Sequence, residues 1–476
     1  MRRTRVMVAL AGAVAAWCAA SLAVMAAPAA GAVARADSWG KAIEVPGLAR
    51  LSAGHGGTLV AVSCSSPGNC SADGNYTDHL GRHQAFVVNE KNGSWGSATE
   101  VPRLAALNTG KDAQLMSLSC SSAGNCAAGG FYTNSSPRNR AFVVSEKNGS
   151  WGKAMQVPGA AGLSGAEGSS VLDALSCASA GNCAAGGNYS ADGDQQAFVV
   201  SEKNGSWGKA IEVPGLAALN NGTLAGVNSA SCASAGNCAV TGTYDSGAPA
   251  AFVVNENNGS WAKAIEVPGE FGVATFSSVS CVSAGNCAAV GFSGSITNDA
   301  AFGPLVVNEK NGTWGSAALV TGTTASARNA AASVSCASAG NCEAGGNSAP
   351  VIETPYQAFL VREKNGSWGT AFGVPGLAAL NVDGNADVAS VSCKTARNCA
   401  AGGTYRDGNG HQQAFVVSEN NGTWSKAIEA PGSAALNTGG SAYITSVSCT
   451  SARYCVAAGN YTELSGNGGA FLVSRT

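Results

Sequence analysis

The sequence is poor in charge and in histidine, and it lacks a long apolar run after its first residues. Of 476 residues, 12% are charged and four are histidine. Beyond residue 36, no stretch reaches the roughly 18 uninterrupted apolar residues of a membrane-spanning helix, so we expect no membrane span. No His-x-His or Cys-x-x-Cys spacing occurs, so no short motif indicates a metal site or thiol exchange, and we expect no cofactor.

The first 36 residues have the build of a cleavable secretory signal. Arg2, Arg3 and Arg5 precede an Ala/Val/Leu-rich run that ends in small residues near Ala36. We therefore predict that residues 1–36 are a signal peptide and that the protein is secreted. Removal of its four arginines would leave 23 of the 27 basic residues against 29 acidic ones, a net charge of about −6. That balance disfavours nucleic acid as a partner, because binding to phosphate needs concentrated positive charge.

Eight tryptophans mark a repeat of about 55 residues. They stand at Trp39, Trp95, Trp151, Trp207, Trp261, Trp314, Trp368 and Trp424. Each is followed by a segment such as 207–215, a variable loop, a pair of cysteines, a run of small residues and a segment like 251–254. A fixed period of this length is typical of folds in which each unit packs on its neighbours.

Each repeat contains four short strand candidates, which we name a, b, c and d. Strand c reads Phe86-Val87-Val88 without polar alternation, as in a strand that is covered on both faces. The c to d connection is Asn92-Gly93, a pair that favours a tight hairpin because both residues tolerate positive φ. We predict an all-β fold, an eight-bladed β-propeller of four-stranded antiparallel blades. In the first complete repeat the strands are expected at residues 59–64, 70–76, 85–91 and 95–101.

The two ends of the chain favour a closed ring. After the signal the sequence begins with a strand d at Trp39, whereas the last repeat stops after strand c at residues 471–473. Pairing of the N-terminal strand in the last blade would satisfy both otherwise unpaired edges. We therefore predict that residues 37–476 form a single propeller domain of eight repeats, and we expect a monomer. An open β-solenoid and two smaller assemblies are the alternatives.

Sixteen of the 17 cysteines form eight pairs, one per repeat, between strands a and b. We predict a local disulfide in each pair, because two thiolates per repeat fall short of the four ligands of a structural zinc site and export favours oxidation. Each bridge would close a short loop. The pairs are Cys64 and Cys70, Cys120 and Cys126, Cys177 and Cys183, Cys232 and Cys238, Cys281 and Cys287, Cys336 and Cys342, Cys393 and Cys399, and Cys449 and Cys455.

A binding site is expected in the variable connections. The a to b and c to d turns lie on one face of a propeller and are short and nearly invariant here, whereas the b to c and d to a loops lie on the other face and vary in length and charge. Loops free of the packing constraints of a repeat are where function accumulates. The alternative interpretation is ordinary loop solvation. The candidate ligand-binding residues are His55, Asp78, His79, Lys111, Asp112, Arg138, Asp192, Asp245, Arg406 and Asp407.

The segment 145–151, Ser-Glu-Lys-Asn-Gly-Ser-Trp, and its counterparts resemble a shortened Asp-box, the Ser-x-Asp-x-Gly-x-Thr-Trp turn of sialidase-type propellers. The Asp is missing and the spacing is one residue shorter. The Ser-Cys-x5-Cys-x-Ala pattern is similar to secreted bacterial propeller repeats. The resemblance implies the propeller fold. It does not imply sialidase activity, because the arginine triad and tyrosine nucleophile of sialidases have no matching positions here.

Two classes of function fit these observations. The first is a secreted, non-catalytic binding or adhesion module whose variable loops recognise an extracellular glycan or protein. The alternative is a polysaccharide-directed glycoside hydrolase or lyase, for which two carboxylates, or a His or Tyr with a partner, would have to converge in one cleft. A cell-envelope structural protein with no discrete ligand is the third interpretation. No catalytic residue is assigned from the sequence.

Overall fold

The computed structural model describes residues 38–191, 193–269, 273–294, 303–324, 329–349, 355–382 and 384–476. The described residues belong to one compact unit, Asp37–Thr476. The predicted signal peptide lies outside the described residues. Among those that are described, no helix combines the length and apolar character needed to cross a membrane.

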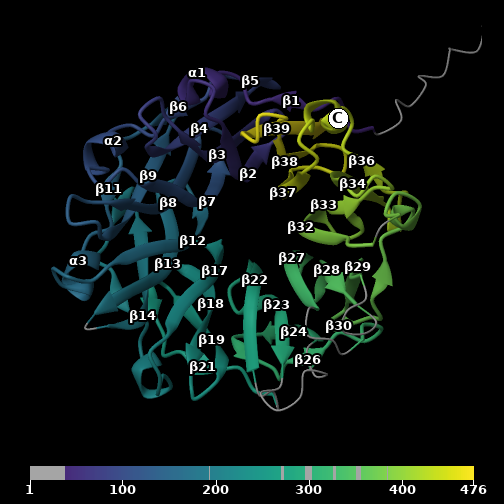
Figure 1. The fold of residues 1–476 in the computed structure, drawn as a ribbon. Coiled ribbons are helices and arrows are strands. Elements are labelled where there is room, and N and C mark those ends of the chain that lie inside the picture. The colour runs from purple at the N-terminus through teal and green to yellow at the C-terminus, as the bar shows by residue number, and fades with distance from the viewer. Residues whose placement is uncertain are drawn as a thin grey trace, which may run out of the picture. The chain divides into compact units, whose positions relative to one another are not determined.

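Within Asp37–Thr476, the described strands form eight antiparallel sheets that stand around a common centre (Figure 1). The predicted eight-bladed propeller is thereby confirmed. Strand a of each blade lies nearest the centre. From blade 1 to blade 8 these strands are β2 (Gly57–Ser66), β7 (Ala113–Ser122), β12 (Ser170–Ser179), β17 (Ala225–Ser234), β22 (Val273–Ser283), β27 (Ala330–Ser338), β32 (Asp387–Thr395) and β37 (Ala442–Cys449).

Strands b and c form the middle of each blade. The b strands are β3 (Asn69–Thr77), β8 (Asn125–Thr133), β13 (Asn182–Ala191), β18 (Asn237–Asp245), β23 (Asn286–Gly294), β28 (Asn341–Ser348), β33 (Asn398–Arg406) and β38 (Cys455–Thr462). The c strands are β4 (His83–Lys91), β9 (Asn139–Lys147), β14 (Asp194–Lys203), β19 (Pro249–Asn257), β24 (Gly303–Lys310), β29 (Gln357–Lys364), β34 (Gln412–Asn420) and β39 (Gly468–Arg475).

The prediction of one continuous strand d, residues 95–101 in the first repeat, was wrong. In blade 1 the outer strand is split into β5 (Ser94–Trp95) and β6 (Thr99–Glu100), which both pair with β4. Between them the chain leaves the sheet, and the Ala98 N–H donates to Pro46 O at 2.7 Å, in the segment before blade 1. The other split strands are β10 (Ser150–Trp151) and β11 (Met155–Gln156), β15 (Ser206–Trp207) and β16 (Ile211–Glu212), β20 (Ser260–Trp261) and β21 (Ile265–Glu266), β25 (Thr313–Trp314) and β26 (Ala318–Leu319), β30 (Ser367–Trp368) and β31 (Phe372–Gly373), and β35 (Thr423–Trp424) and β36 (Ile428–Glu429).

The ring closes as predicted, by pairing of the N-terminal strand in blade 8. Strand β1 (Ile43–Glu44) pairs with β39 in the register Ile43 to Leu472, and Trp39 forms a bridge with Arg475. This pairing supplies the outer strand that the last repeat lacks. Short helices follow the outer strands: α1 (Leu48–Ser52), α2 (Leu104–Leu107), α3 (Ala160–Ser164), α4 (Ser433–Leu436) and the 3-10 turns η1 (Leu216–Ala218) and η3 (Leu377–Ala379).

The serine that precedes the first cysteine of each repeat supplies a hydrogen-bond acceptor at the inner edge of the blades. Its hydroxyl accepts the backbone N–H of the equivalent cysteine in the next blade, and the ring ends with Cys64 donating to Ser448 at 2.9 Å. Edge N–H groups would otherwise be free to pair with another chain, so the eight serines protect the edge. The remaining bonds join Cys120 to Ser63, Cys177 to Ser119, Cys232 to Ser176, Cys281 to Ser231, Cys336 to Ser280, Cys393 to Ser335 and Cys449 to Ser392.

The core consists of separate clusters that repeat between neighbouring blades. In blade 1, Phe86, Val87 and Val88 are at most 1% exposed, which confirms that strand c is covered on both faces. Phe86 and Val88 pack with Leu59 and with Leu472 of blade 8, whereas Val87 packs with residues of blade 2. Each sheet therefore contributes its two faces to two different clusters.

All eight predicted disulfides are present, each with cysteines six residues apart and S–S distances from 1.98 to 2.11 Å. Because each bridge joins strands a and b beside their turn, it fixes that hairpin. Disulfides in this number indicate an oxidising environment, as outside the cell.

Candidate functional site

The face that carries the b to c and d to a connections, here the loop face, contains most of the residues predicted to bind a ligand. Several of them instead shape the loops. Asp78 Oδ1 accepts the N–H groups of Leu80 and Arg82 at 2.8 and 3.0 Å, and Asp78 Oδ2 accepts Arg82 Nε at 2.7 Å. Partial burial acts in the opposite sense, but these hydrogen bonds together lower the pKa of Asp78. A buried carboxylate occupied in this way serves the turn.

Two more predicted residues cap the same kind of turn. Asp407 Oδ1 accepts the N–H groups of Asn409 and His411, both at 2.9 Å. Asp245 Oδ1 accepts the N–H of Gly247 at 2.9 Å. The carboxylates of Asp407 and Asp245 therefore accept hydrogen bonds from their own turns.

Two of the predicted residues of blade 2, Lys111 and Asp112, contact His83 of blade 1, which was not among the ten. His83 N–H donates to Lys111 O at 3.0 Å, and His83 Nδ1 lies 3.2 Å from Asp112 Oδ1. Asp112 also accepts Gln114 Nε2 at 3.1 Å. This contact joins the loop of blade 1 to the entry of blade 2, and its exposed groups do not enclose a ligand.

The other loop-face candidates remain apart. Arg138 pairs with Glu167 at 2.9 Å on the surface, whereas His55, His79 and Arg406 have exposed side chains. Asp192 lies outside the described residues. A pocket of about 290 Å³ on this face, between blades 8 and 1, is lined by Glu44, Tyr461 and helix α1 and includes none of the ten predicted residues.

The opposite face carries the short a to b and c to d turns, and we call it the turn face. In blade 1 the two turns touch, because the Gly93 N–H donates to Gly68 O at 2.9 Å. Asn92 and Gly93 have φ values of 51° and 80°, which confirms the tight hairpin expected for Asn-Gly. A Cβ on Gly68 would lie 2.6 Å from Gly93 N, so this position requires glycine for close approach as well as for its positive φ of 73°.

Three pockets open between adjacent blades on the turn face. They measure about 690 Å³ between blades 1 and 2, about 330 Å³ between blades 5 and 6, and about 330 Å³ between blades 6 and 7. Their walls use the same positions of the repeat, namely an Asn and an Ala of the a to b turns, the last Glu and Lys of strand c, and cysteines of both disulfides. The equivalent residues are Asn69, Asn286 and Asn341; Glu90, Glu309 and Glu363; Lys91, Lys310 and Lys364; and Ala123, Ala339 and Ala396.

In blades 1 to 5, a polar side chain of strand c links the blade to the next one. Asn89 of blade 1 donates to the carboxylate of Glu146 of blade 2, and its own oxygen accepts Trp151 Nε1 at 3.2 Å. Ser145 does the same with Glu202 at 3.0 Å and Trp207 at 3.3 Å. Equivalent links use Ser201 with Glu256 and Trp261, Asn255 with Glu309 and Trp314, and Asn308 with Glu363 and Trp368.

The glutamates of these links are almost fully buried. Glu146 and Glu363 are 4% and 3% exposed. Burial raises the pKa of each, and the hydrogen bond from the neighbouring blade only partly opposes it. Among the described residues, Oε2 of both Glu309 and Glu363 has no hydrogen-bond partner. Both oxygens are buried in the walls of the pocket between blades 5 and 6.

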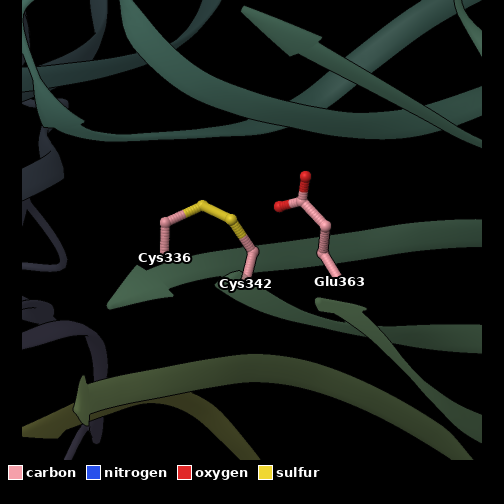
Figure 2. A group of neighbouring side chains, drawn as sticks. All are labelled: Cys336, Cys342 and Glu363. Atoms are coloured by element: carbon pink, nitrogen blue, oxygen red, sulfur yellow. A yellow bond between two sulfur atoms is a disulfide. The ribbon is translucent and has the colours of Figure 1, made fainter. Parts of the chain in front are cut away.

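The disulfide and glutamate of a pocket lie side by side, as Figure 2 shows for Cys336, Cys342 and Glu363. The sulfur and carboxylate atoms of these three residues lie close enough together to surround one metal ion. The same is true of Glu343, Cys399 and Glu419. All three cysteines are in disulfides, however, so they offer no thiolate to a metal ion. The disulfide and the glutamate therefore form a polar part of the pocket wall.

Sequence reasoning placed the site on the loop face and did not single out these residues. The available signal was the Glu of the repeated Ser-Glu-Lys-Asn-Gly segment. It recurs near the end of strand c, after an apolar run and one polar residue, as in residues 141–146. A charged residue fixed at such a position indicates a buried partner, because charged side chains are rarely buried unless paired.

The fold and these pockets define the class of the protein, an eight-bladed β-propeller with polar pockets between its blades. No known family model matches the sequence, and no curated protein matches it. Among solved structures, a PL25 ulvan lyase is 10% identical with a TM-score of 0.45, over 92% of this chain and 98% of that one.

Two further structures are similar at the same low level. The β-propeller domain of the Trilobed protease from Pyrococcus furiosus is 8% identical with a TM-score of 0.40, over 88% of this chain and 95% of that one. A subtype N11 neuraminidase-like protein of A/flat-faced bat/Peru/033/2010 is 11% identical with a TM-score of 0.35, over 89% and 88%. Similarities of this size carry no argument about function.

Proposed function

We propose that this protein is a secreted, non-catalytic binding module that recognises a glycan through the pockets between its blades. The observation that carries the proposal is the repetition of one polar pocket at three blade junctions, with equivalent Asn, Glu, Lys and Ala residues in each. Volumes of 330 to 690 Å³ fall within the range of small-molecule sites.

The repetition favours a glycan over a protein partner. A specific protein interface buries about 800 Å² on each side as one continuous patch, whereas these pockets are separate and concave. A linear polysaccharide presents the same hydroxyl-rich unit again and again. Amide and ammonium groups such as those of Asn341 and Lys364 suit hydroxyl groups, and several weak contacts on one polymer add up to high avidity.

The hydrolase or lyase alternative has one observation in its favour. Between blades 6 and 7, burial raises the pKa of Glu343 to about 7, although Arg362 opposes the shift, so this carboxyl group could hold a proton at neutral pH. The side chains of Glu343 and Glu419 are only 2% and 0% exposed, and both pair with Arg362. A carboxyl group enclosed in this way is poorly placed to reach a substrate, so we favour the binding module.

The test is a screen of the purified protein against soluble polysaccharides, with binding and product formation followed in the same samples. Binding without product is expected. Release of oligosaccharides or of unsaturated ends would replace the proposal with the alternative. The remaining outcome is that the protein binds no polysaccharide and binds a protein partner, with Lys111→Ala or Arg138→Ala weakening that binding. This result would place the binding site on the loop face.

Filling the pockets gives a sharper version of the test. Ala123 and Ala339 occupy equivalent exposed positions in the pockets between blades 1 and 2 and between blades 5 and 6. Ala123→Trp and Ala339→Trp should each lower the apparent affinity for a polysaccharide, and the double variant should lower it by at least the product of the two factors. Lys111→Ala, on the loop face, is the matched control and should bind as the unchanged protein does.

A further inference from the structure

The pocket between blades 6 and 7 departs from its equivalents by two arginines. Arg362 occupies the position of Asn308 in the preceding blade, and Arg397 occupies the position of Gly340. Both line this pocket, together with Lys364. The pocket thus keeps the shared plan of the repeat and adds guanidinium groups to it.

The charge of Arg362 is already balanced by the protein. Its Nε donates to Glu343 at 2.9 Å, and its Nη2 donates to Glu419 of blade 7. Glu343 itself replaces the small residue that other repeats have at this point of strand b, such as Ala288. Arg362 and Glu343 are therefore a coupled change that forms the wall of the pocket, and the positive charge available to a ligand comes from Arg397 and Lys364.

Arg397 is held in a backbone conformation that disfavours any residue except glycine. Its φ is 73°, and its carbonyl accepts the Gly422 N–H at 2.8 Å, as in the other repeats. At the equivalent Gly124, an added Cβ would lie 2.5 Å from Gly149 N. Glycine occupies this positive-φ position in six repeats: Gly68, Gly124, Gly181, Gly236, Gly285 and Gly340. Non-glycine residues persist in such conformations mainly where they serve a function.

The guanidinium group of Arg397, which lines the pocket, is held by a hydrogen bond. Its Nη2 donates to Asn421 O at 2.6 Å, in the c to d turn of the same blade, while the side chain as a whole is exposed. That bond uses one of the five donors of the guanidinium group. A planar guanidinium group binds a carboxylate through two parallel hydrogen bonds, which a lysine cannot do.

We propose that the pocket between blades 6 and 7 takes a carboxylate-bearing sugar residue, with Arg397 bound to the carboxylate and Lys364 adding positive charge. This inference rests on the proposed glycan-binding function. The other two pockets have glycine at the position of Arg397 and accept the hydroxyl groups of the same polymer. The protein therefore selects acidic polysaccharides such as polyuronates over neutral ones.

The experiment compares oligosaccharides of galacturonic acid and of glucuronic acid with the same oligosaccharides after chemical reduction of their carboxyl groups. The unchanged protein should bind at least one acidic form about tenfold or more tightly than its reduced form, and added salt should diminish that preference. Arg397→Gly restores the residue of the other repeats and should abolish the preference while keeping the affinity for the reduced form. Arg453→Gly, at the equivalent position of the last repeat, is the matched control and should keep the preference.

The outcomes separate this inference from the function on which it rests. Equal affinity for acidic and reduced forms, or a preference that survives Arg397→Gly, would overturn the inference and leave glycan binding in place. Failure to bind oligosaccharides of either kind or any polysaccharide would remove both. Because Gly is the residue of the repeat at this position, loss of folding is not expected, and a thermal unfolding measurement on each variant checks this.

Discussion

Tyr454 of the last blade donates its hydroxyl hydrogen to the carboxylate of Glu90 of the first blade, with both oxygens 2.7 Å away. At this junction it takes the role that Asn89 has for Glu146 at the next one. Tyr454 stands where the other repeats have the Asn of the a to b turn, such as Asn69. The junction between blades 8 and 1, which closes the ring, is therefore stabilised by a residue that the other junctions lack.

We predict that Tyr454→Phe destabilises the closed ring. The substitution leaves the buried carboxylate of Glu90 without its donor, which costs about 1 to 3 kcal/mol. Denaturant unfolding would measure this loss. Tyr443→Phe, in the neighbouring strand β37, is the control for removal of a tyrosine hydroxyl and should change the free energy of unfolding by less than about 0.5 kcal/mol. Equal effects of the two substitutions would show that the bond to Glu90 does not matter for stability.

A second prediction concerns pH and Asp73 of strand β3. Asp73 is fully buried, its Oδ1 accepts the Ala61 N–H at 2.9 Å, and its Oδ2 has no partner among the described residues. Burial raises the pKa of Asp73 to about 7, with the backbone hydrogen bonds opposing the shift. The folded protein therefore binds this proton more tightly than the unfolded chain. The stabilisation is complete below the usual pKa of 3.8 and disappears as pH rises through about 7.

The measurement is the free energy of unfolding of the unchanged protein and of Asp73→Asn at several pH values. Relative to the variant, the unchanged protein should lose stability between about pH 4 and pH 7, because Asn does not titrate. Asp78→Asn is the control. Hydrogen bonds lower the pKa of Asp78, so replacing this residue should change the pH dependence of stability only below about pH 4. A difference between the unchanged protein and Asp73→Asn that is constant from pH 4 to pH 7 would refute the assignment.

The sequence predicted the architecture well because the architecture depends on periodic features. The spacing of the tryptophans, the apolar runs such as 86–88 and the offset between the two ends were enough to predict the blades and their closure. The eight disulfides followed from the single cysteine pair in each repeat together with the expected export. The split of strand d was missed because a local pattern does not show that the Ala98 N–H bonds to Pro46, in the preceding outer segment.

The candidate site was much less predictable than the fold. Charged loop residues such as Asp78 look available in a sequence, yet their oxygens accept hydrogen bonds from their own turn. The bonds that organise the turn face join residues about 57 positions apart on neighbouring blades, as in Asn89 and Glu146. A sequence does not show which of these side chains face each other until the ring is built.

Removal of one disulfide tests the contribution of the local bridges. Each closes a loop with cysteines six residues apart, for which chain entropy gives a stabilisation of about 2 kcal/mol. The double variants Cys64→Ala/Cys70→Ala and Cys232→Ala/Cys238→Ala should therefore lose similar amounts in denaturant unfolding. The two hairpins occupy equivalent places in blades 1 and 4, so each serves as control for the other. Losses that differ by more than about 2 kcal/mol would mean that local strain or packing, and not loop entropy, sets the contribution.

The last prediction separates stability from recognition at Arg397. Since φ is 73° there and six equivalent positions hold glycine, Arg397→Gly should relieve backbone strain of about 1 kcal/mol and raise the free energy of unfolding by a similar amount. The same variant should lose the preference for acidic oligosaccharides. Gly340→Ala, at the equivalent position of blade 6, is the reciprocal control, and because its Cβ would lie 2.6 Å from Gly366 N it should destabilise the protein. If Arg397→Gly proves less stable than the unchanged protein, Arg397 supports the fold through its bond to Asn421, and its retention at this position gives no evidence for a ligand.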